Sequence, residues 1–159
     1  MPLIIDGHNL LWSIQKASEE DASVDAVRLS HVVGRYLKLV ADTGEIVFDG
    51  TGPPDKGRFE NIASMEVFFA GLSTDADTVI EDKIKASSAP KRLTVVSSDR
   101  RVRKAAMARK ATAVKSEIFW TNLCRRLARP PKEKEPSAKR QGLSEGETDQ
   151  WLKVFGIEE

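Results

Sequence analysis

The chain has 159 residues, of which 40% are hydrophobic and 31% are charged, and these values are typical of one soluble globular domain. No apolar run is long enough to cross a bilayer, and the single cysteine excludes an internal disulfide framework and a multi-cysteine zinc site. Met1-Pro2 leads directly into an apolar run, without the basic-then-apolar pattern of an export signal. We therefore expect a cytoplasmic protein with no membrane partner.

Lysine and arginine are distributed unevenly along the chain. Residues 100–140 contain 14 Lys or Arg against 3 Asp or Glu, a net charge of +11, so the remainder carries −10 within a total of +1. An acidic region beside a basic one is typical of a metal-dependent enzyme that acts on a polyanion. The same cations can instead serve only to solvate helix faces and a linker, and composition leaves both interpretations open.

Apolar runs and helical periodicities alternate along the first 128 residues. The first half predicts, in chain order, a strand at 3–6, one or two helical turns at 10–15, an amphipathic helix at 23–40 capped by Ser23, a strand at 45–48, a Gly/Pro loop at 50–57, a short helix at 58–64 and a strand at 66–70. The second half predicts a helix at 74–87, a strand at 93–96, a helix at 99–110, a strand at 111–114 and a helix at 116–128. Strands that alternate with helices form a parallel sheet, so we predict a three-layer α/β fold with five strands.

The last thirty residues have a different composition. Residues 129–142 contain three prolines, many charges and no large apolar side chain after Arg129, which predicts a flexible charged linker. Residues 143–159 have a capping-box pattern at 144–147 followed by Trp151, Leu152 and Phe155, which predicts a short C-terminal helical segment. A helix with this apolar content is expected to dock on its own domain or on a partner.

Acidic residues occur at three places that a parallel sheet would bring to one edge. Asp6 closes the first strand, Asp99 follows the fourth, and Asp75 and Asp77 begin the helix after the third. Carboxylates clustered without Cys or His favour a hard divalent ion such as Mg²⁺, which can activate water and offset the charge of a phosphodiester. Asn9, one turn after Asp6, offers an amide oxygen that can ligate the ion or position water. The sequence thus predicts a metal site at the carboxyl edge of the sheet.

Each of these acids also has an ordinary structural interpretation. Thr74 with Asp77 fits a capping box, and Asp99 or Ser98 can cap the helix that follows. Asp49, followed by Gly50, is typical of a simple turn. Taken one at a time these interpretations are sufficient, whereas the shared position at strand ends favours a site.

Four short motifs together resemble a known family. They are Leu-Ile-Ile-Asp-Gly-His-Asn-Leu at 3–10, Val-Phe-Asp-Gly at 47–50, Asp-Ala-Asp-Thr-Val-Ile-Glu at 75–81 and Val-Val-Ser-Ser-Asp-Arg-Arg-Val-Arg at 95–103. In this order, over residues 1–128, the chain resembles the NYN domain family, in its YacP-like branch, within the PIN-like ribonuclease superfamily. The resemblance implies a nuclease domain at 1–128 whose five parallel strands are ordered 3-2-1-4-5.

The resemblance also assigns roles to the acidic residues. It implies that Asp6, Asp77 and Asp99 bind Mg²⁺ or Mn²⁺, that Asp75 assists them, and that Asn9 belongs to the catalytic set with Asp6, Asp77 and Asp99. The first strand and the fourth would then be neighbours, and the crevice between their carboxyl ends is where open α/β sheets bind ligands.

The predicted function is a metal-dependent ribonuclease, an endonuclease that hydrolyses RNA phosphodiester bonds. The residues expected to contact the RNA backbone are Ser98, Arg100, Arg101, Arg103 and Lys104. Aromatic content is only 6%, so no base-stacking platform is evident, and Trp12 and Trp120 are expected in the core or in a groove wall. The oligomeric state cannot be inferred.

Two other function classes deserve comparison. A non-catalytic RNA-binding or ribosome-associated module on the same fold is the alternative, because basic residues follow Asp99 where many PIN-like proteins have a fourth acid. Retention of three clustered carboxylates argues against it, since they repel one another without a cation. A phosphotransferase or phosphatase of the haloacid-dehalogenase type is disfavoured, because that chemistry needs a second Asp where His8 stands.

Overall fold

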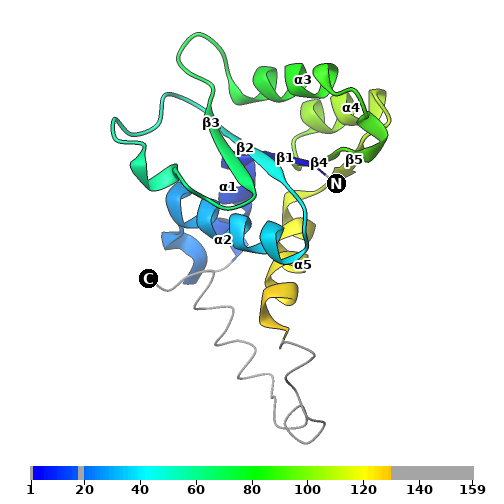
Figure 1. Ribbon diagram of the computed structural model, residues 1–159. Helices are drawn as coiled ribbons and strands as arrows, with labels where there is room; N and C mark the ends of the chain where they lie inside the picture. Colours follow the sequence, from blue (N-terminus) through cyan, green and yellow to red (C-terminus); the bar gives the residue numbers. More distant parts are fainter. Residues whose placement is uncertain (1, 18–19, 130–159) are drawn as a thin grey trace, which may run out of the picture.

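The computed structural model describes residues 2–17 and 20–129 (Figure 1). Apart from Arg129, the predicted linker at 129–142 and the predicted helical segment at 143–159 lie outside the described residues. Within the described part of the chain, no helix is long and apolar enough to span a membrane.

Five parallel strands form one sheet. They are β1 (Leu3–Asp6), β2 (Gly44–Phe48), β3 (Met65–Phe69), β4 (Thr94–Val96) and β5 (Thr112–Val114). The order across the sheet is β3-β2-β1-β4-β5, so the predicted fold class and strand order are confirmed. Leu3 pairs with Gly44 on one side and with Thr94 on the other, so the three central strands start level and also finish near one another.

Helices cover both faces of the sheet. They are α1 (Gly7–Ala17), α2 (Ala26–Leu39), α3 (Ala76–Ala86), α4 (Arg100–Ala108) and α5 (Ser116–Ala128), with 3-10 turns η1 (Glu20–Ser23), η2 (Gly57–Phe59) and η3 (Pro90–Arg92). Figure 1 shows α1, α2 and α5 on one face and α3 with α4 on the other. Alternate residues of β1 serve the two layers: Ile5 packs in the core under α1, α2 and α5, and Ile4 packs in the core under α3 and α4.

Three predicted boundaries were wrong for identifiable reasons. The predicted turns at 10–15 are part of the longer α1, which begins directly after the strand. The cap of α2 is Asp25, whose carboxylate accepts from the Arg28 N–H, and not Ser23, which belongs to η1. The predicted helix at 58–64 is only the single turn η2, and residues 60–64 form no helix.

Gly7 makes the immediate passage from β1 into α1 feasible. A Cβ at this position would lie 2.5 Å from Phe48 Cε1 and 2.9 Å from the Val47 carbonyl oxygen, closer than real Cβ atoms approach. The lack of a side chain lets α1 start beside the end of β2. This tight start fixes Asp6 at the carboxyl edge and sends α1 to one face, while α4 leaves β4 toward the other face. The gap between β1 and β4 is therefore the switch point of the sheet.

Candidate functional site

Asp6 is buried at the end of β1, with 5% of its surface exposed. Its Oδ2 accepts a hydrogen bond of 2.8 Å from Ser97 Oγ, and the same hydroxyl oxygen accepts the Asp99 N–H at 3.0 Å. Ser97 therefore ties the end of β1 to the loop that carries Asp99. The pKa of Asp6 is raised from 3.8 to about 6, chiefly by burial; the hydrogen bond from Ser97 opposes the rise, and the charges of Asp77 and Asp99 contribute to it.

Two acids come from the start of α3. Asp75 is the N-cap, and its Oδ1 accepts from the Thr78 N–H at 2.8 Å, so the predicted Thr74 cap is wrong. Hydrogen bonding with Thr78, first through its side chain and next through its backbone N–H, lowers the pKa of Asp75. Asp77 lies in the first turn, and its pKa is raised by burial and next by the charge of Asp99. Asp77 and Asp99 are thus electrostatic neighbours, although they are 22 positions apart in the sequence.

Asp99 caps the N-terminus of α4, as the sequence allowed. It is the N-cap of α4, where its Oδ1 accepts from the backbone N–H groups of Arg101, at 2.9 Å, and Val102, at 3.2 Å. Both cap bonds go to Oδ1. Capping and ligation are compatible, because a carboxylate has two oxygens with several acceptor positions.

Asn9 connects three segments that meet at the site. Its Oδ1 accepts the Ser98 N–H at 2.9 Å and the Ser116 hydroxyl at 2.7 Å, from the end of β4 and the start of α5. Ser98 Oγ in turn accepts the Ser116 N–H at 3.0 Å and donates to Glu117 Oε1 at 2.6 Å. The Asn9 amide oxygen is therefore engaged in positioning the loops that frame Asp6.

Glu117 is an acid at this edge that the sequence analysis missed. It lies in the first turn of α5, immediately after β5, and its hydrogen bond with Ser98 lowers its pKa. The signal was available, because Glu117 follows a strand by a few residues just as Asp99 does. The sequence pattern of this helix is set by its apolar residues, such as Ile118 and Phe119, and Glu117 is not part of that pattern.

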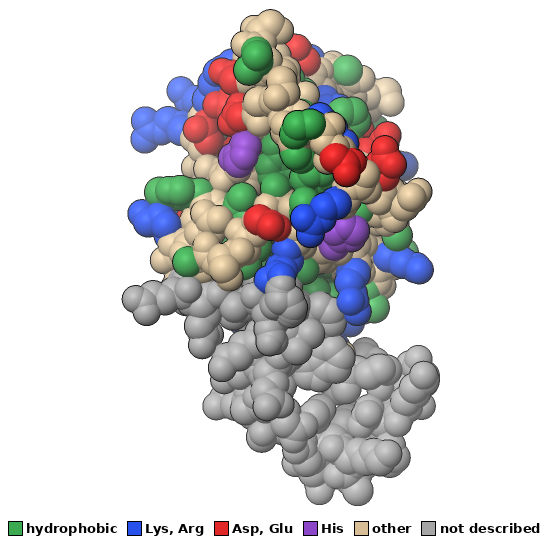
Figure 2. All heavy atoms as spheres, turned by 90° about the vertical axis from the view of Figure 1, so that its left-hand side faces the viewer, with side chains coloured by type: hydrophobic (Ala, Val, Ile, Leu, Met, Phe, Trp, Pro, Cys, Tyr) green, Lys and Arg blue, Asp and Glu red, His purple; other side chains and the backbone are tan. Residues whose placement is uncertain are grey.

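Asp49 also belongs to this edge and is more than a turn residue. Its Oδ1 accepts the Ala76 N–H at 2.7 Å, at the start of α3, and its charge contributes to the raised pKa of Asp77. The Asp49 N–H donates to His8 Nδ1 at 3.0 Å, so His8 is held at the start of α1. In the space-filling view of Figure 2, acidic side chains gather beside one of the two histidines.

Arg101 reaches from α4 into the acidic residues of α3. Its guanidinium makes a two-pronged pair with Glu81, with both N···O distances 2.9 Å, and donates to Thr78 Oγ1 at 3.1 Å. Its Nη1 lies 3.8 Å from Asp75 Oδ2 and 4.0 Å from Asp77 Oδ2. Arg101 was predicted to contact RNA, and in this structure it acts as a counter-ion for the carboxylates of α3.

The other predicted basic contacts lie on the same helix. Arg100 and Lys104 are exposed and line an open pocket of about 670 Å³ together with Glu81 and Asp99. Arg103 is half-buried, and its Nη1 donates to the Ser97 carbonyl oxygen at 3.4 Å. Arg100 and Lys104 are therefore the cations of this set best placed to meet a ligand beside Asp99.

The donor set fits a hard divalent ion in its chemistry. The charges of Asp77 and Asp99 help to raise the pKa of Asp6, and the charge of Asp99 helps to raise that of Asp77, which is repulsion that a bound cation would relieve; all the donors are oxygen. Among the described residues, however, no group of three or more His, Cys, Asp or Glu side chains is arranged to hold a metal ion. The carboxylates of the described residues therefore interact electrostatically but do not form a preformed coordination shell.

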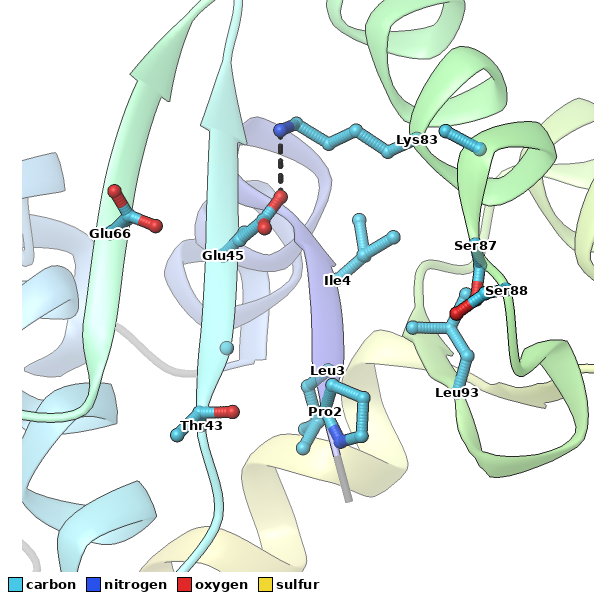
Figure 3. A pocket seen from close by; sticks show the side chains of 12 residues that line it. Pro2, Leu3, Ile4, Thr43, Glu45, Glu66, Lys83, Ser87, Ser88 and Leu93 are labelled. Atoms are coloured by element: carbon cyan, nitrogen blue, oxygen red, sulfur yellow. Dashed lines mark ion pairs between the residues drawn. The ribbon is translucent and has the colours of Figure 1, made fainter.

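A second hollow lies at the opposite edge of the sheet. This cavity of about 530 Å³ opens at the amino ends of β1, β2 and β4, beside α3 (Figure 3). The Lys83 ammonium crosses it to Glu45, with Nζ 2.7 Å from Oε1, and lies 3.6 Å from the centre of the Phe68 ring. Lys83 is thus paired locally with Glu45, and the cavity contains none of the predicted site residues.

An all-parallel sheet ordered 3-2-1-4-5, with carboxylates at the switch point between β1 and β4, fits the PIN-like class of domains. The family model for the YacP-like NYN domain matches residues 3–154, and the chain therefore belongs to this family of PIN-like, RNase-type domains. The match extends past residue 128 and includes residues outside the described part.

Two solved structures show the same fold. The chain is similar to the crystal structure of Rae1 (YacP) from Bacillus subtilis, with 18% identity, a TM-score of 0.65, and coverage of 98% of this chain and 92% of that one. The crystal structure of its W164L mutant gives 18% identity, a TM-score of 0.61, and coverage of 98% and 93%. No curated protein matched the chain.

Proposed function

We propose that this protein is a metal-dependent endoribonuclease whose active site lies at the carboxyl edge between β1 and β4. The observation that supports it best is the buried Asp6 carboxylate, facing the charges of Asp77 and Asp99. Three neighbouring carboxylates destabilise a fold unless a cation offsets them, so their joint presence favours a bound divalent ion. Membership of an RNase-type family supplies the substrate class.

Each residue then has a distinct task. Asp6, Asp77 and Asp99 would hold Mg²⁺ or Mn²⁺, with Asp75 near them, and the ion would supply a water of lowered pKa and offset charge on the phosphodiester. Asn9 and Ser97 hold the strand-end loops so that Asp6 and Asp99 keep their relative positions. These contacts pre-organise the site before RNA arrives.

Substrate binding is assigned to the basic start of α4. Arg100 and Lys104 line the open pocket beside Asp99, where phosphate groups of RNA would be neutralised. Arg103 and Ser98, which were predicted to contact RNA, support the site through their hydrogen bonds to Ser97 and Glu117. Arg101 would reach RNA only by giving up its pair with Glu81, and its present contacts place it with the carboxylates.

Two observations favour the alternative, a non-catalytic module that binds RNA or associates with the ribosome. Arg101 already pairs with the acids of α3, and the described residues contain no group of three ligands arranged for a metal ion. In that alternative, Arg101 replaces the metal permanently and the domain only binds RNA.

The two functions are separated by a cleavage assay. The wild-type protein and Asp6→Asn are incubated with a mixed pool of RNA in Mg²⁺ or Mn²⁺, with EDTA as a parallel treatment. The proposed nuclease cleaves the pool, and cleavage disappears both with EDTA and in Asp6→Asn. Binding of RNA without cleavage in either metal would establish the non-catalytic module instead.

A further inference from the structure

Helix α1 exposes a single stripe of side chains that the proposed site does not use. His8, Trp12 and Lys16 follow one another at four-residue spacing and are exposed, whereas Leu10 and Ile14 on the other side are fully buried. Trp12 is 57% exposed, so of the two predicted places, the core and a groove wall, the core is wrong. Helical geometry makes this stripe about 12 Å long.

The chemistry of the stripe suits a nucleic acid. The Lys16 ammonium lies 4.2 Å from the centre of the Trp12 ring, so an aromatic face and a cation are presented together. Helix α1 contains no Asp or Glu, and nothing on the helix itself opposes the approach of phosphate. An indole face is a stacking surface for any base, and an adjacent ammonium neutralises a phosphate.

His8 connects the stripe to the carboxyl edge of the sheet. It lies two residues after Asp6, and its Nδ1 accepts the Asp49 N–H, so the proton of the neutral imidazole is on Nε2. That Nε2–H is a hydrogen-bond donor on an exposed side chain at the end of the stripe nearest Asp6. The first residue of the stripe, His8, therefore lies beside Asp49 of the carboxyl edge.

We propose that His8, Trp12 and Lys16 form a binding track for the single-stranded RNA that enters the site. A base stacks on the Trp12 ring, and Lys16 neutralises a neighbouring phosphate. His8 Nε2 donates a hydrogen bond to the RNA where it passes next to the carboxylates. The proposal rests on RNA being the substrate, as inferred above, and adds to it that the substrate is single-stranded along α1. A single exposed aromatic residue is ordinary on a protein surface, and the observations that select RNA are the cation over the ring, the lack of acids on α1 itself and the position of His8 beside the Asp49 carboxylate of the carboxyl edge.

Binding is measured in the full chain with Asp6→Asn as the background, so that RNA stays intact. A fluorescently labelled single-stranded RNA is titrated in buffer with EDTA, and the anisotropy gives Kd. Trp12→Ala is expected to raise Kd about ten- to hundredfold, the range for loss of one stacked base. Trp12→Phe retains a ring and should raise Kd much less. Lys16→Ala should raise Kd modestly and reduce its dependence on salt concentration.

Leu39→Ala is the matched control, because Leu39 is 49% exposed at the end of α2, which leads to the amino edge of the sheet. The proposal is overturned if Trp12→Ala binds RNA as Leu39→Ala does while both keep the wild-type circular dichroism. It is also overturned if Trp12→Ala leaves RNA binding intact but changes the sedimentation coefficient or lowers Tm, because the stripe then serves a protein contact.

The wild-type background separates this proposal from the proposed activity. If the protein cleaves RNA but Trp12→Ala leaves KM unchanged, the track is wrong and the nuclease stands. If Trp12→Ala weakens binding but no variant cleaves in Mg²⁺ or Mn²⁺, the track stands and the nuclease is wrong.

Discussion

The two edges of the sheet treat their charged groups differently. At the amino edge, Glu45 lies 2.7 Å from Lys83, so one acid has one cation. At the carboxyl edge, Asp75, Asp77 and Glu81 share the guanidinium of Arg101, and the buried Asp6 has a hydroxyl partner and no cation within ion-pair distance in the described part of the chain. Charges that stabilise a fold are paired, whereas an excess of one sign that the fold itself does not offset points to a missing ligand.

The largest effect on RNA cleavage is expected from Asp6, the buried acid with no cation beside it among the described residues. Asp6→Asn keeps the size of the side chain and the acceptor for Ser97 Oγ, but removes a charge from the metal site. We expect RNA cleavage to fall at least about a hundredfold, because even the partners of metal ligands cost 10- to 100-fold when they are changed. Glu45→Gln at the amino edge is the control, and steady-state cleavage rates give the comparison. Equal losses in both variants would contradict the distinction between the two edges.

A change in the backbone tests how the carboxyl edge is positioned. Gly7→Ala brings a Cβ against the Phe48 ring and the Val47 carbonyl oxygen, so the start of α1 must shift. We expect a loss of about 1–3 kcal/mol in the free energy of unfolding, as for other overpacked positions. Urea denaturation measures it. Gly57→Ala is the control, because among the described residues the only contact of its Cβ is the end of the Asp55 side chain at 3.1 Å, and a loss as large there would show that Gly7 has no special role.

Arg101 tests whether one guanidinium substitutes for a metal ion. Arg101→Gln leaves the acids of α3 without their cation, so Tm should fall in EDTA and recover in Mn²⁺ by more than wild-type Tm rises. Arg100→Gln is a neighbouring control, since the described residues offer Arg100 no ion-pair partner. Thermal denaturation with and without Mn²⁺ provides the readout. A smaller Mn²⁺ response in Arg101→Gln than in wild type would contradict the hypothesis that the guanidinium substitutes for the ion.

The smallest effect is expected at the amino edge. Lys83→Met removes the pair with Glu45 but keeps an apolar stem beside Phe68, so the free energy of unfolding should change by no more than about 1 kcal/mol, as for partly exposed ion pairs. The rate of RNA cleavage should stay at the wild-type value. A large loss of cleavage in Lys83→Met would give the cavity at this edge a role that the Lys83–Glu45 pair does not suggest.

The strand ends could be predicted because they depend on local sequence. An apolar run closed by an acid places Asp6 and Asp99 at the carboxyl edge, and the alternation of elements gives the α/β class. The strand order came from the family resemblance, and the structure confirms it.

The cross-connections of the site could not be predicted from local sequence. Asn9 bonds to Ser98 and Ser116, which are 89 and 107 positions away, so its role emerges only when three strand ends meet. Arg101 looked like an RNA contact because the sequence shows its charge, and only the packing of α3 against α4 shows that Glu81 holds it. Trp12 was expected in the core or in a groove wall, whereas the buried Leu10 and Ile14 set the phase of α1 and put Trp12 on the exposed side with His8 and Lys16.

The most direct test is the pH dependence of stability in wild type and Asp6→Asn, with and without Mn²⁺. The pKa of Asp6 is raised to about 6 in the fold, so its ionisation opposes folding. The wild-type protein in EDTA should therefore lose stability relative to Asp6→Asn as the pH rises from about 4 to about 6, by on the order of 3 kcal/mol. Above that pH, Mn²⁺ should restore wild type and leave Asp6→Asn almost unchanged. Equal responses of the two proteins to Mn²⁺ at every pH would contradict a metal site built around Asp6.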